Sequence, residues 1–274
     1  AEGVGVRGLI NIQFAMAGNI LYVLEANPRA SRTVPFVSKA TGVPLAKAAA
    51  RISVGTTIAE LKSEGMLPTE DGLTPRGISV KEAVLPWNRF RRTDGRGVDA
   101  VLGPEMRSTG EVMGVGKTFG EALFKSQLGA GIKLPKSGTV LLTVKDGDKP
   151  KAVEVAKLLH QLGFPMVATK GTVAAIEAAG LPVRLVNKVK DGRPHIVDFI
   201  KNGEISLVFT TVDETRTAIA DSRSIRTSAQ ANGVTYYTTI SAARAVMDGL
   251  LASQKGSKES LEVYSLQDLH RKLI

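Results

Sequence analysis

The chain has 274 residues, of which 43% are hydrophobic and 23% are charged, which is typical of a globular protein with one or two domains. It contains no cysteine, no apolar run of about 18 residues and no recognisable signal peptide, so we expect no disulfides, no membrane partner and a cytoplasmic location. Its 36 Lys and Arg residues outnumber its 26 Asp and Glu residues, and the net charge of +10 favours anionic ligands.

The first predicted element is a β-hairpin. Two apolar runs, Leu9–Met16 and Leu21–Leu24, flank a Gly18-Asn19 turn. Alternate residues of a strand share a face, so residues two positions apart that continue the second strand place their side chains on the same side of the hairpin.

Charged and amide side chains gather where that hairpin ends. Glu25 and Asn27 share one face, and Gln13 of the partner strand can lie opposite Glu25. One carboxylate with two amide oxygens is a set that Mg²⁺ accepts when phosphates supply other ligands. Arg29 and Arg32 follow, and their guanidinium groups suit phosphate or carboxylate oxygens. Taken alone, the same residues also fit a solvated strand end.

The next part of the chain mixes helical and extended patterns. Leu45–Ile52 and Thr57–Leu61 have helical spacing, with Pro44 suited to a helix start and Gly65 to a helix end. Gly and Pro predict a loop over 64–77. Further strands are predicted over 79–86 and around 100–102 and 111–113, and a helix over 118–128.

A basic cluster follows the predicted strand at 79–86. It contains Trp87, Arg89, Phe90, Arg91, Arg92 and Arg96. Basic residues beside aromatics could clamp single-stranded nucleic acid. The chain has no nucleic-acid motif and only 5% aromatic residues, so we expect a solvated surface and no nucleic-acid partner.

After a Gly- and Pro-rich linker at 129–138, strands and helices alternate in short units, which predicts a doubly wound parallel sheet. We place a domain boundary near residue 131. The predicted strands are 139–144, 166–168, 183–185, 206–209 and 235–237. The predicted helices are 151–162, 173–179, 196–201, 218–231, 242–252 and 266–273.

Ligands of such sheets bind beyond the carboxyl ends of the strands. Lys149 precedes one predicted helix, the turn 169–172 offers hydroxyl and N–H groups before another, and Lys188 closes a strand. Each feature alone fits an ordinary connection. Their convergence on one edge predicts a phosphate pocket.

Several long strings in the sequence resemble the large chain of carbamoyl phosphate synthetase, over essentially the whole chain. The strings are Glu25–Gly42 (EANPRASRTVPFVSKATG), Pro86–Phe90 (PWNRF), Leu102–Gly114 (LGPEMRSTGEVMG), Val186–Val189 (VNKV) and Gly192–Ile196 (GRPHI). The resemblance implies the end of an ATP-grasp domain at 1–53, a connecting α+β segment at 54–130 and an allosteric domain similar to methylglyoxal synthase at 131–274. It also implies a C-terminal piece of a longer polypeptide, which alone would be inactive.

The resemblance implies synthesis of carbamoyl phosphate from bicarbonate, ATP and glutamine-derived ammonia for arginine and pyrimidine biosynthesis. Gln13, Glu25 and Asn27 would hold Mg²⁺ or Mn²⁺, while Arg29 and Arg32 would neutralise the transferring phosphoryl group. The expected partners are the rest of the large chain and a glutamine amidotransferase small chain, and K⁺ and a homo-oligomer are compatible with the family.

The resemblance also implies effectors. Residues matching the family's site for UMP or IMP are Thr143, Lys149, Thr169, Gly171, Thr172, Lys188, Thr210 and Thr211. Thr210-Thr211-Val212 departs from the usual Asn-Thr-Thr, which leaves nucleotide selectivity open. Matching positions for ornithine are Glu82, Leu85, Tyr236 and Thr238, although Tyr237 stands where aspartate is common.

A different class of function stays open, a nucleotide-sensing module without catalysis. The chain has only three histidines, His160, His195 and His270. General acid–base catalysis needs a partner within reach, and no aspartate neighbours the 169–172 turn in the sequence. We therefore expect no catalysis by the second half itself.

Overall fold

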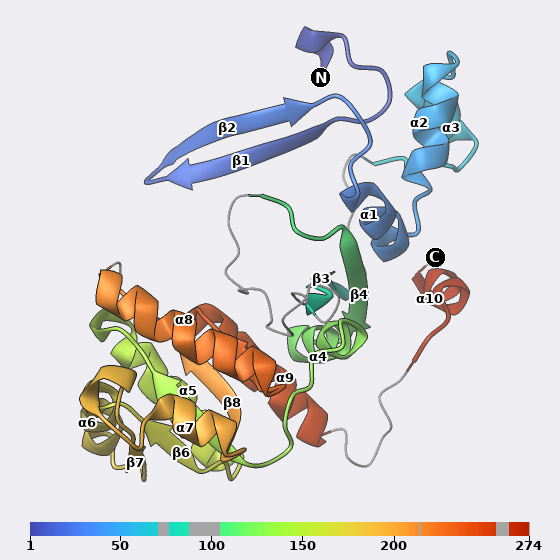
Figure 1. The fold of residues 1–274 in the computed structure, drawn as a ribbon. Coiled ribbons are helices and arrows are strands. Elements are labelled where there is room, and N and C mark those ends of the chain that lie inside the picture. The colour runs from blue at the N-terminus through green and yellow to red at the C-terminus, as the bar shows by residue number, and fades with distance from the viewer. Residues whose placement is uncertain (71–76, 88–104, 214, 256–262, 274) are drawn as a thin grey trace. The chain divides into compact units, whose positions relative to one another are not determined.

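The computed structural model describes residues 1–70, 77–87, 105–213, 215–255 and 263–273. The chain forms two compact units, residues 1–77 with 262–274, and residues 78–261 (Figure 1). The basic cluster at 89–96 and the predicted extended segment at 100–102 lie outside the described residues. Within the described part of the chain, no helix is long and apolar enough to cross a membrane.

The first unit begins with the predicted hairpin. Strands β1 (Asn11–Ala17) and β2 (Ile20–Asn27) pair antiparallel, and Gly18 supplies the positive φ of the turn. Gln13 pairs with Glu25, but Phe14 pairs with Val23, so one extra residue of β2 forms a bulge beside Glu25.

Helices complete the first unit. They are α1 (Thr33–Thr41), α2 (Leu45–Ser53), α3 (Ile58–Ser63) and α10 (Leu266–Leu273), with a short 3-10 turn at Glu2–Val4. Helix α1 was not predicted, because its sequence holds β-branched residues and Pro35. Pro35 is tolerated in the first helical turn, where N–H groups have no intrahelical partner. Helix α10 contacts α1, and His270 Nε2 donates to the Lys39 carbonyl at 2.9 Å.

The second unit begins with an antiparallel pair of strands, β3 (Ile78–Val84) and β4 (Gly110–Gly116), against which helix α4 (Phe119–Gly129) packs. Gly114 permits this close packing, because a Cβ at that position would overlap the backbone of α4 at Ala122. Helix α4 also packs against α9 (Ile240–Lys255).

A five-stranded parallel sheet forms the rest of the second unit, in the order β7-β6-β5-β8-β9. The strands are β5 (Thr139–Thr143), β6 (Met166–Ala168), β7 (Arg184–Leu185), β8 (Ile205–Thr210) and β9 (Thr235–Tyr237). The chain leaves β5 toward β7 on one side and then returns to build β8 and β9 on the other. The topological switch point therefore lies between β5 and β8.

Helices cover both faces of this sheet (Figure 1). They are α5 (Lys149–Gln161), α6 (Lys170–Ala178), α7 (Ile196–Lys201), α8 (Arg216–Ala231) and α9, with 3-10 turns at Asp146–Asp148 and Val189–Asp191. Along β5, Val140 and Leu142 join the core under α5 and α9, whereas Leu141 joins the core under α7 and α8. This burial on both faces confirms the predicted doubly wound sheet.

Candidate functional site

The switch point brings together the carboxyl ends of β5 and β8. Thr143 pairs with Thr210 as the last residues of these strands, and the Thr211 N–H donates to the Thr143 carbonyl at 3.0 Å. The Thr211 hydroxyl in turn accepts from the Lys145 N–H at 3.1 Å. The two strand ends are therefore joined by hydrogen bonds at the place where doubly wound sheets bind ligands.

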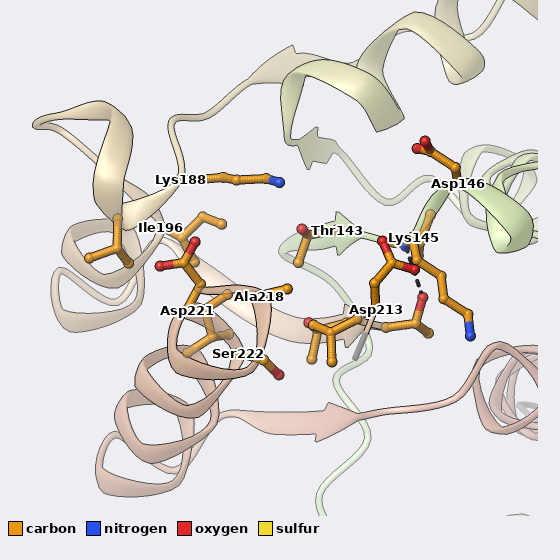
Figure 2. Close-up of a pocket in the computed structure, with 15 residues that line it drawn as sticks. Thr143, Lys145, Asp146, Lys188, Ile196, Asp213, Ala218, Asp221 and Ser222 are labelled. Atoms are coloured by element: carbon orange, nitrogen blue, oxygen red, sulfur yellow. Dashed lines mark hydrogen bonds between the residues drawn. The ribbon is translucent and has the colours of Figure 1, made fainter. Parts of the chain in front are cut away.

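A cavity of about 110 Å³ opens at this point (Figure 2). It is lined by Thr143, Val144, Lys145, Asp146, Lys188, Val189, Ile196, Thr210, Thr211, Val212, Asp213, Ala218, Asp221, Ser222 and Ile225. Four residues of the predicted nucleotide set are among them, namely Thr143, Lys188, Thr210 and Thr211. Since typical ligand pockets hold about 300–1,000 Å³, this cavity encloses only part of a nucleotide, and the remainder would lie across its open mouth.

Lys188 supplies a cation to this cavity. It follows the edge strand β7 and immediately precedes the 3-10 turn at 189–191. Its side chain extends toward Thr143 in Figure 2, whereas the Lys145 ammonium points away from both. Of these two lysines, Lys188 is therefore the one placed to meet an anion in the cavity.

Lys149 stands next to the cavity and is held by two neighbours. Its Nζ lies 2.7 Å from Asp146 Oδ1, and a Cβ added at Gly171 would lie 2.9 Å from that same Nζ. Gly171 thus leaves room for the ammonium at the first turn of α6. Asp146 links Lys149 to the cavity, because it lines the cavity and pairs with Lys149.

The other two predicted residues of the nucleotide set support the loop from within. The Thr169 hydroxyl lies 3.2 Å from the Thr143 hydroxyl, and the Thr172 hydroxyl accepts from the Val144 N–H at 3.3 Å. Both threonines are buried, at 3% and 1% exposure. In this arrangement they fix β5 against α6, and Thr143 presents the hydroxyl that lines the cavity.

Three aspartates also line the cavity, and none of them was predicted from the sequence as a site residue. Asp146 lies in the loop after β5, Asp213 follows β8, and Asp221 lies on α8. The hydrogen bond and charge of Lys149, together with the charge of Lys188, hold the pKa of Asp146 below its usual value. Because these residues come from separate loops and a helix, only the fold brings them together.

Thr210 is the last residue of β8 and lines the cavity. It is 2% exposed, and its hydroxyl has no hydrogen-bond partner within the described part of the chain. A buried polar group without a partner is costly.

A second cavity, of about 700 Å³, lies in the same unit. It is lined by Leu85, Trp87, Gly131, Ile132, Lys133, Arg226, Gln230, Gly233, Val234, Thr235, Tyr236, Tyr237 and Thr238. Three of the residues predicted to bind ornithine, Leu85, Tyr236 and Thr238, are therefore brought together.

The fourth residue predicted to bind ornithine, Glu82, does not line this cavity in the described structure. Its Oε2 accepts from Gln127 Nε2 at 2.7 Å, and Gln127 Oε1 accepts from the Tyr237 hydroxyl at 2.6 Å. Burial raises the pKa of Glu82, although the Gln127 hydrogen bond lowers it in part, and burial raises the pKa of Tyr237. These three side chains thus form a hydrogen-bonded chain within the fold.

In the first unit, the hairpin presents the predicted metal ligands at its end. Gln13 and Glu25 are cross-strand neighbours, and Asn27 Nδ2 donates to Glu25 Oε1 at 2.8 Å. The donor set fits a hard cation, provided that the Asn27 amide rotates to present its oxygen. Its single carboxylate means that further ligands, such as phosphate oxygens, must complete the coordination. Among the described residues, no cluster of three or more His, Cys, Asp or Glu could hold a metal by itself.

The two predicted arginines follow the same strand. Arg29 is exposed and donates to the neighbouring Ala30 carbonyl at 3.3 Å, and Arg32 immediately precedes α1. Arg29 also lines a small cavity with Asn11 and Ser31. Both guanidinium groups thus lie within a few residues of Glu25 and Asn27, at the end of the hairpin.

Comparison with known proteins gives family matches in two regions of the chain. Residues 1–61 match the family described as "Carbamoyl-phosphate synthase L chain, ATP binding domain", and residues 151–238 match the "MGS-like domain". The carbamoyl phosphate synthase large chain of Ralstonia nicotianae is 64% identical over 100% of this chain and 24% of its own length. The large chain of Pasteurella multocida is 50% identical over 100% of this chain and 24% of its own length. The large chain of Streptomyces coelicolor is 52% identical over 98% of this chain and 25% of its own length. The chain thus spans about a quarter of the length of these relatives.

Proposed function

We propose that this chain contains the C-terminal part of the ATP-binding domain of a carbamoyl phosphate synthase large chain, together with the regulatory nucleotide pocket of that large chain. The proposal is supported by homology to such large chains along the whole length of the chain. The family predicted from the sequence is confirmed. The proposed activity of the whole large chain is ATP-dependent formation of carbamoyl phosphate from bicarbonate and ammonia, with a small glutaminase chain supplying the ammonia.

The single observation that supports regulation is the cavity at the β5/β8 switch point. It combines the Lys188 ammonium, the Thr143 hydroxyl and the partnerless Thr210 hydroxyl, with Lys149 beside it. Ammonium and hydroxyl donors suit a phosphate. The carboxylate of Asp221 can accept hydrogen bonds from ribose hydroxyls or base N–H groups, so the lining suits a nucleoside monophosphate such as UMP or IMP.

The hairpin contributes to the proposed catalysis by position and charge. Gln13, Glu25 and Asn27 would hold a divalent cation, which supplies charge neutralisation at the ATP phosphates. Arg29 and Arg32 would stabilise negative charge on the transferring phosphoryl group. In the full-length large chain, we expect Glu25→Ala to abolish carbamate-dependent ATP turnover; unchanged turnover would contradict this role.

The regulatory pocket is tested by titrating UMP into the chain and following binding by calorimetry. Lys188→Ala should weaken UMP binding at least about tenfold, since a charged hydrogen bond contributes roughly 1.5–3 kcal/mol. Lys190→Ala is the matched control, because Lys190 lies two residues away and does not line the cavity. Equal loss in both variants, or no loss in either, would contradict the proposed pocket.

A nucleotide-sensing module without catalysis is the second candidate. It is favoured by one observation, that the cavity is built entirely from residues of the second unit. UMP binding to this chain, together with a native polypeptide that has no upstream segment carrying an ATP-binding loop, would favour this second candidate. Ornithine remains a predicted ligand of the second cavity.

A further inference from the structure

The position of helix α1 is coupled to the positions of the two proposed catalytic arginines. Arg32 immediately precedes the first residue of α1. Val34 and Val37 of the helix line the same small cavity as Arg29. A shift of α1 therefore displaces Arg32 and one wall of the cavity that Arg29 lines.

Helix α1 has little stability of its own. It is nine residues long, and isolated helices shorter than about 12 to 15 residues are marginal in water. Its β-branched residues, which lower helix propensity, are Thr33, Val34, Val37 and Thr41. All of its residues except Ala40 are half-buried or exposed. Contacts with other elements must therefore hold α1 in place, and α2 and α10 supply them.

The C-terminal end of α1 is closed by a side chain of α10. The last carbonyls of an α-helix have no hydrogen-bond partner within the helix. The Ser38 carbonyl still accepts from the Gly42 N–H at 2.9 Å, but the next carbonyl, that of Lys39, accepts from His270 Nε2 at 2.9 Å. The imidazole also packs at Gly42, where an added Cβ would lie 3.7 Å from His270 Cδ2. His270 is thus a cap of α1 that comes from 231 residues further along the chain.

Helix α10 presents His270 together with two leucines. Leu266, Leu269 and His270 are three and four residues apart, so they share one face of the helix, and all three are half-buried. The Ser265 hydroxyl accepts from the Asp268 N–H at 3.0 Å and caps the first turn. Helix α10 belongs to the first unit, although it follows α9 of the second unit in the sequence. The end of the chain therefore supplies one of the supports of α1.

We propose that His270 is a positioning residue for phosphoryl transfer, because it caps the helix whose opposite end adjoins Arg32. The proposal rests on the proposed role of Arg32 at the transferring phosphoryl group. A helix of this length spans about 14 Å as one rigid element, so a loss of support at its last turn is transmitted to its first. Displacement of a positioned group by about 1 Å can lower a rate by orders of magnitude. His270 acts through α1 and does not itself contact the reacting atoms.

The test uses the assembled synthase with variants of His270 in the large chain, and it measures carbamate-dependent ATP turnover. His270→Ala should lower kcat about threefold to tenfold, the range of one lost hydrogen bond, and leave the KM for ATP within about twofold. His270→Gln should restore most of kcat, because its amide N–H can donate to the same Lys39 carbonyl. Arg271→Ala is the matched control, since Arg271 is an exposed neighbour on α10 that pairs with Asp268.

Hydrogen exchange of the α1 backbone amides tests the support itself. His270→Ala should speed this exchange, whereas Arg271→Ala should not. Unchanged kcat in the His270→Ala synthase overturns the proposal, whatever the exchange rate. Equal loss of kcat in Arg271→Ala, or no recovery in His270→Gln, overturns it as well.

Arg32→Ala separates this proposal from the proposed function. Full turnover in the Arg32→Ala synthase would contradict the catalytic role of Arg32, and with it the reason for positioning α1. Lost turnover in Arg32→Ala together with full turnover in His270→Ala would overturn the role of His270 alone.

Discussion

The hairpin of the first unit and the parallel sheet of the second differ in how deeply the strands that carry their polar residues are buried. In the sheet, β5 and β8 are buried on both faces, with Leu142 and Leu207 fully inaccessible. In the hairpin, apolar side chains such as Met16 (74% exposed) and Leu24 (63% exposed) face solvent. The cavity residues are thus held by a core, whereas Gln13, Glu25 and Asn27 are held mainly by strand pairing.

This difference predicts which site can work within the described residues. The switch-point cavity has cations, hydroxyls and a positioning framework within one unit. The hairpin has one carboxylate and an apolar surface of the kind that normally packs against another partner or segment. We therefore expect nucleotide binding by this chain, and metal chemistry only when other groups complete the hairpin site.

The largest expected effect contrasts the two supports directly. Leu142→Ala in β5 should lower the free energy of unfolding by about 2–5 kcal/mol, because it leaves a cavity in the core. Leu24→Ala in the hairpin should change it by less than about 0.5 kcal/mol. Denaturant unfolding measures both, and similar losses in the two variants would refute the contrast.

The next largest effect tests whether Gly171, in the first turn of α6, is needed to leave room for the Lys149 ammonium. Gly171→Ala places a methyl group against Lys149 Nζ, so Lys149 must move and UMP should bind about five- to tenfold more weakly. Gly147→Ala is the control, because a Cβ there meets nothing within 4 Å. Calorimetric affinities of the two variants give the comparison, and equal affinities would argue against a role for Lys149.

A smaller effect of opposite sign is expected at Asp146. The Asp146 carboxylate lies 2.7 Å from the Lys149 ammonium, so it competes with a bound phosphate for that ammonium. Asp146→Asn should tighten UMP binding by up to about fivefold, the range of an exposed ion pair. Asp148→Asn, on the same loop, should leave the affinity unchanged. Weaker binding by Asp146→Asn would instead make Asp146 a ligand-binding residue.

The smallest effect concerns pH. Burial raises the pKa of Glu82 above its unfolded value, so the native state binds its proton more tightly. The contribution of Glu82 to stability is full below its ordinary pKa of about 4.3 and is lost as pH rises through the raised pKa. We expect a loss of less than about 1 kcal/mol, because the side chain is only half-buried. Glu82→Gln should flatten this part of the pH–stability curve, and an identical curve would contradict the assignment.

The sequence predicted the regular parts of both regions. The sheet and the hairpin were predictable because the alternation of strand and helix patterns after the linker, and the apolar runs around Gly18-Asn19, are local features of the sequence. Helix α1 was not predicted, because the β-branched residues around Pro35 have low helix propensity and tertiary packing overrides that propensity in the fold.

The candidate site was only partly predictable, for a different physical reason. Thr143, Lys188, Thr210 and Thr211 lie at strand ends, where parallel sheets bring residues together. Asp146, Asp213 and Asp221 reach the same cavity from two loops and a helix, and no local pattern indicates that convergence. Likewise, the Glu82–Gln127–Tyr237 chain joins residues more than 40 positions apart in sequence.

The most direct test of regulation is UMP inhibition of carbamoyl phosphate synthesis by an assembled synthase that carries Lys188→Ala in the large chain. Lys190→Ala serves as the matched variant. We expect the Lys188→Ala synthase to need at least about ten times more UMP for half-inhibition, whereas the Lys190→Ala synthase should respond like the original enzyme. Unchanged UMP inhibition in the Lys188→Ala synthase would contradict the assignment of the switch-point cavity as the regulatory site.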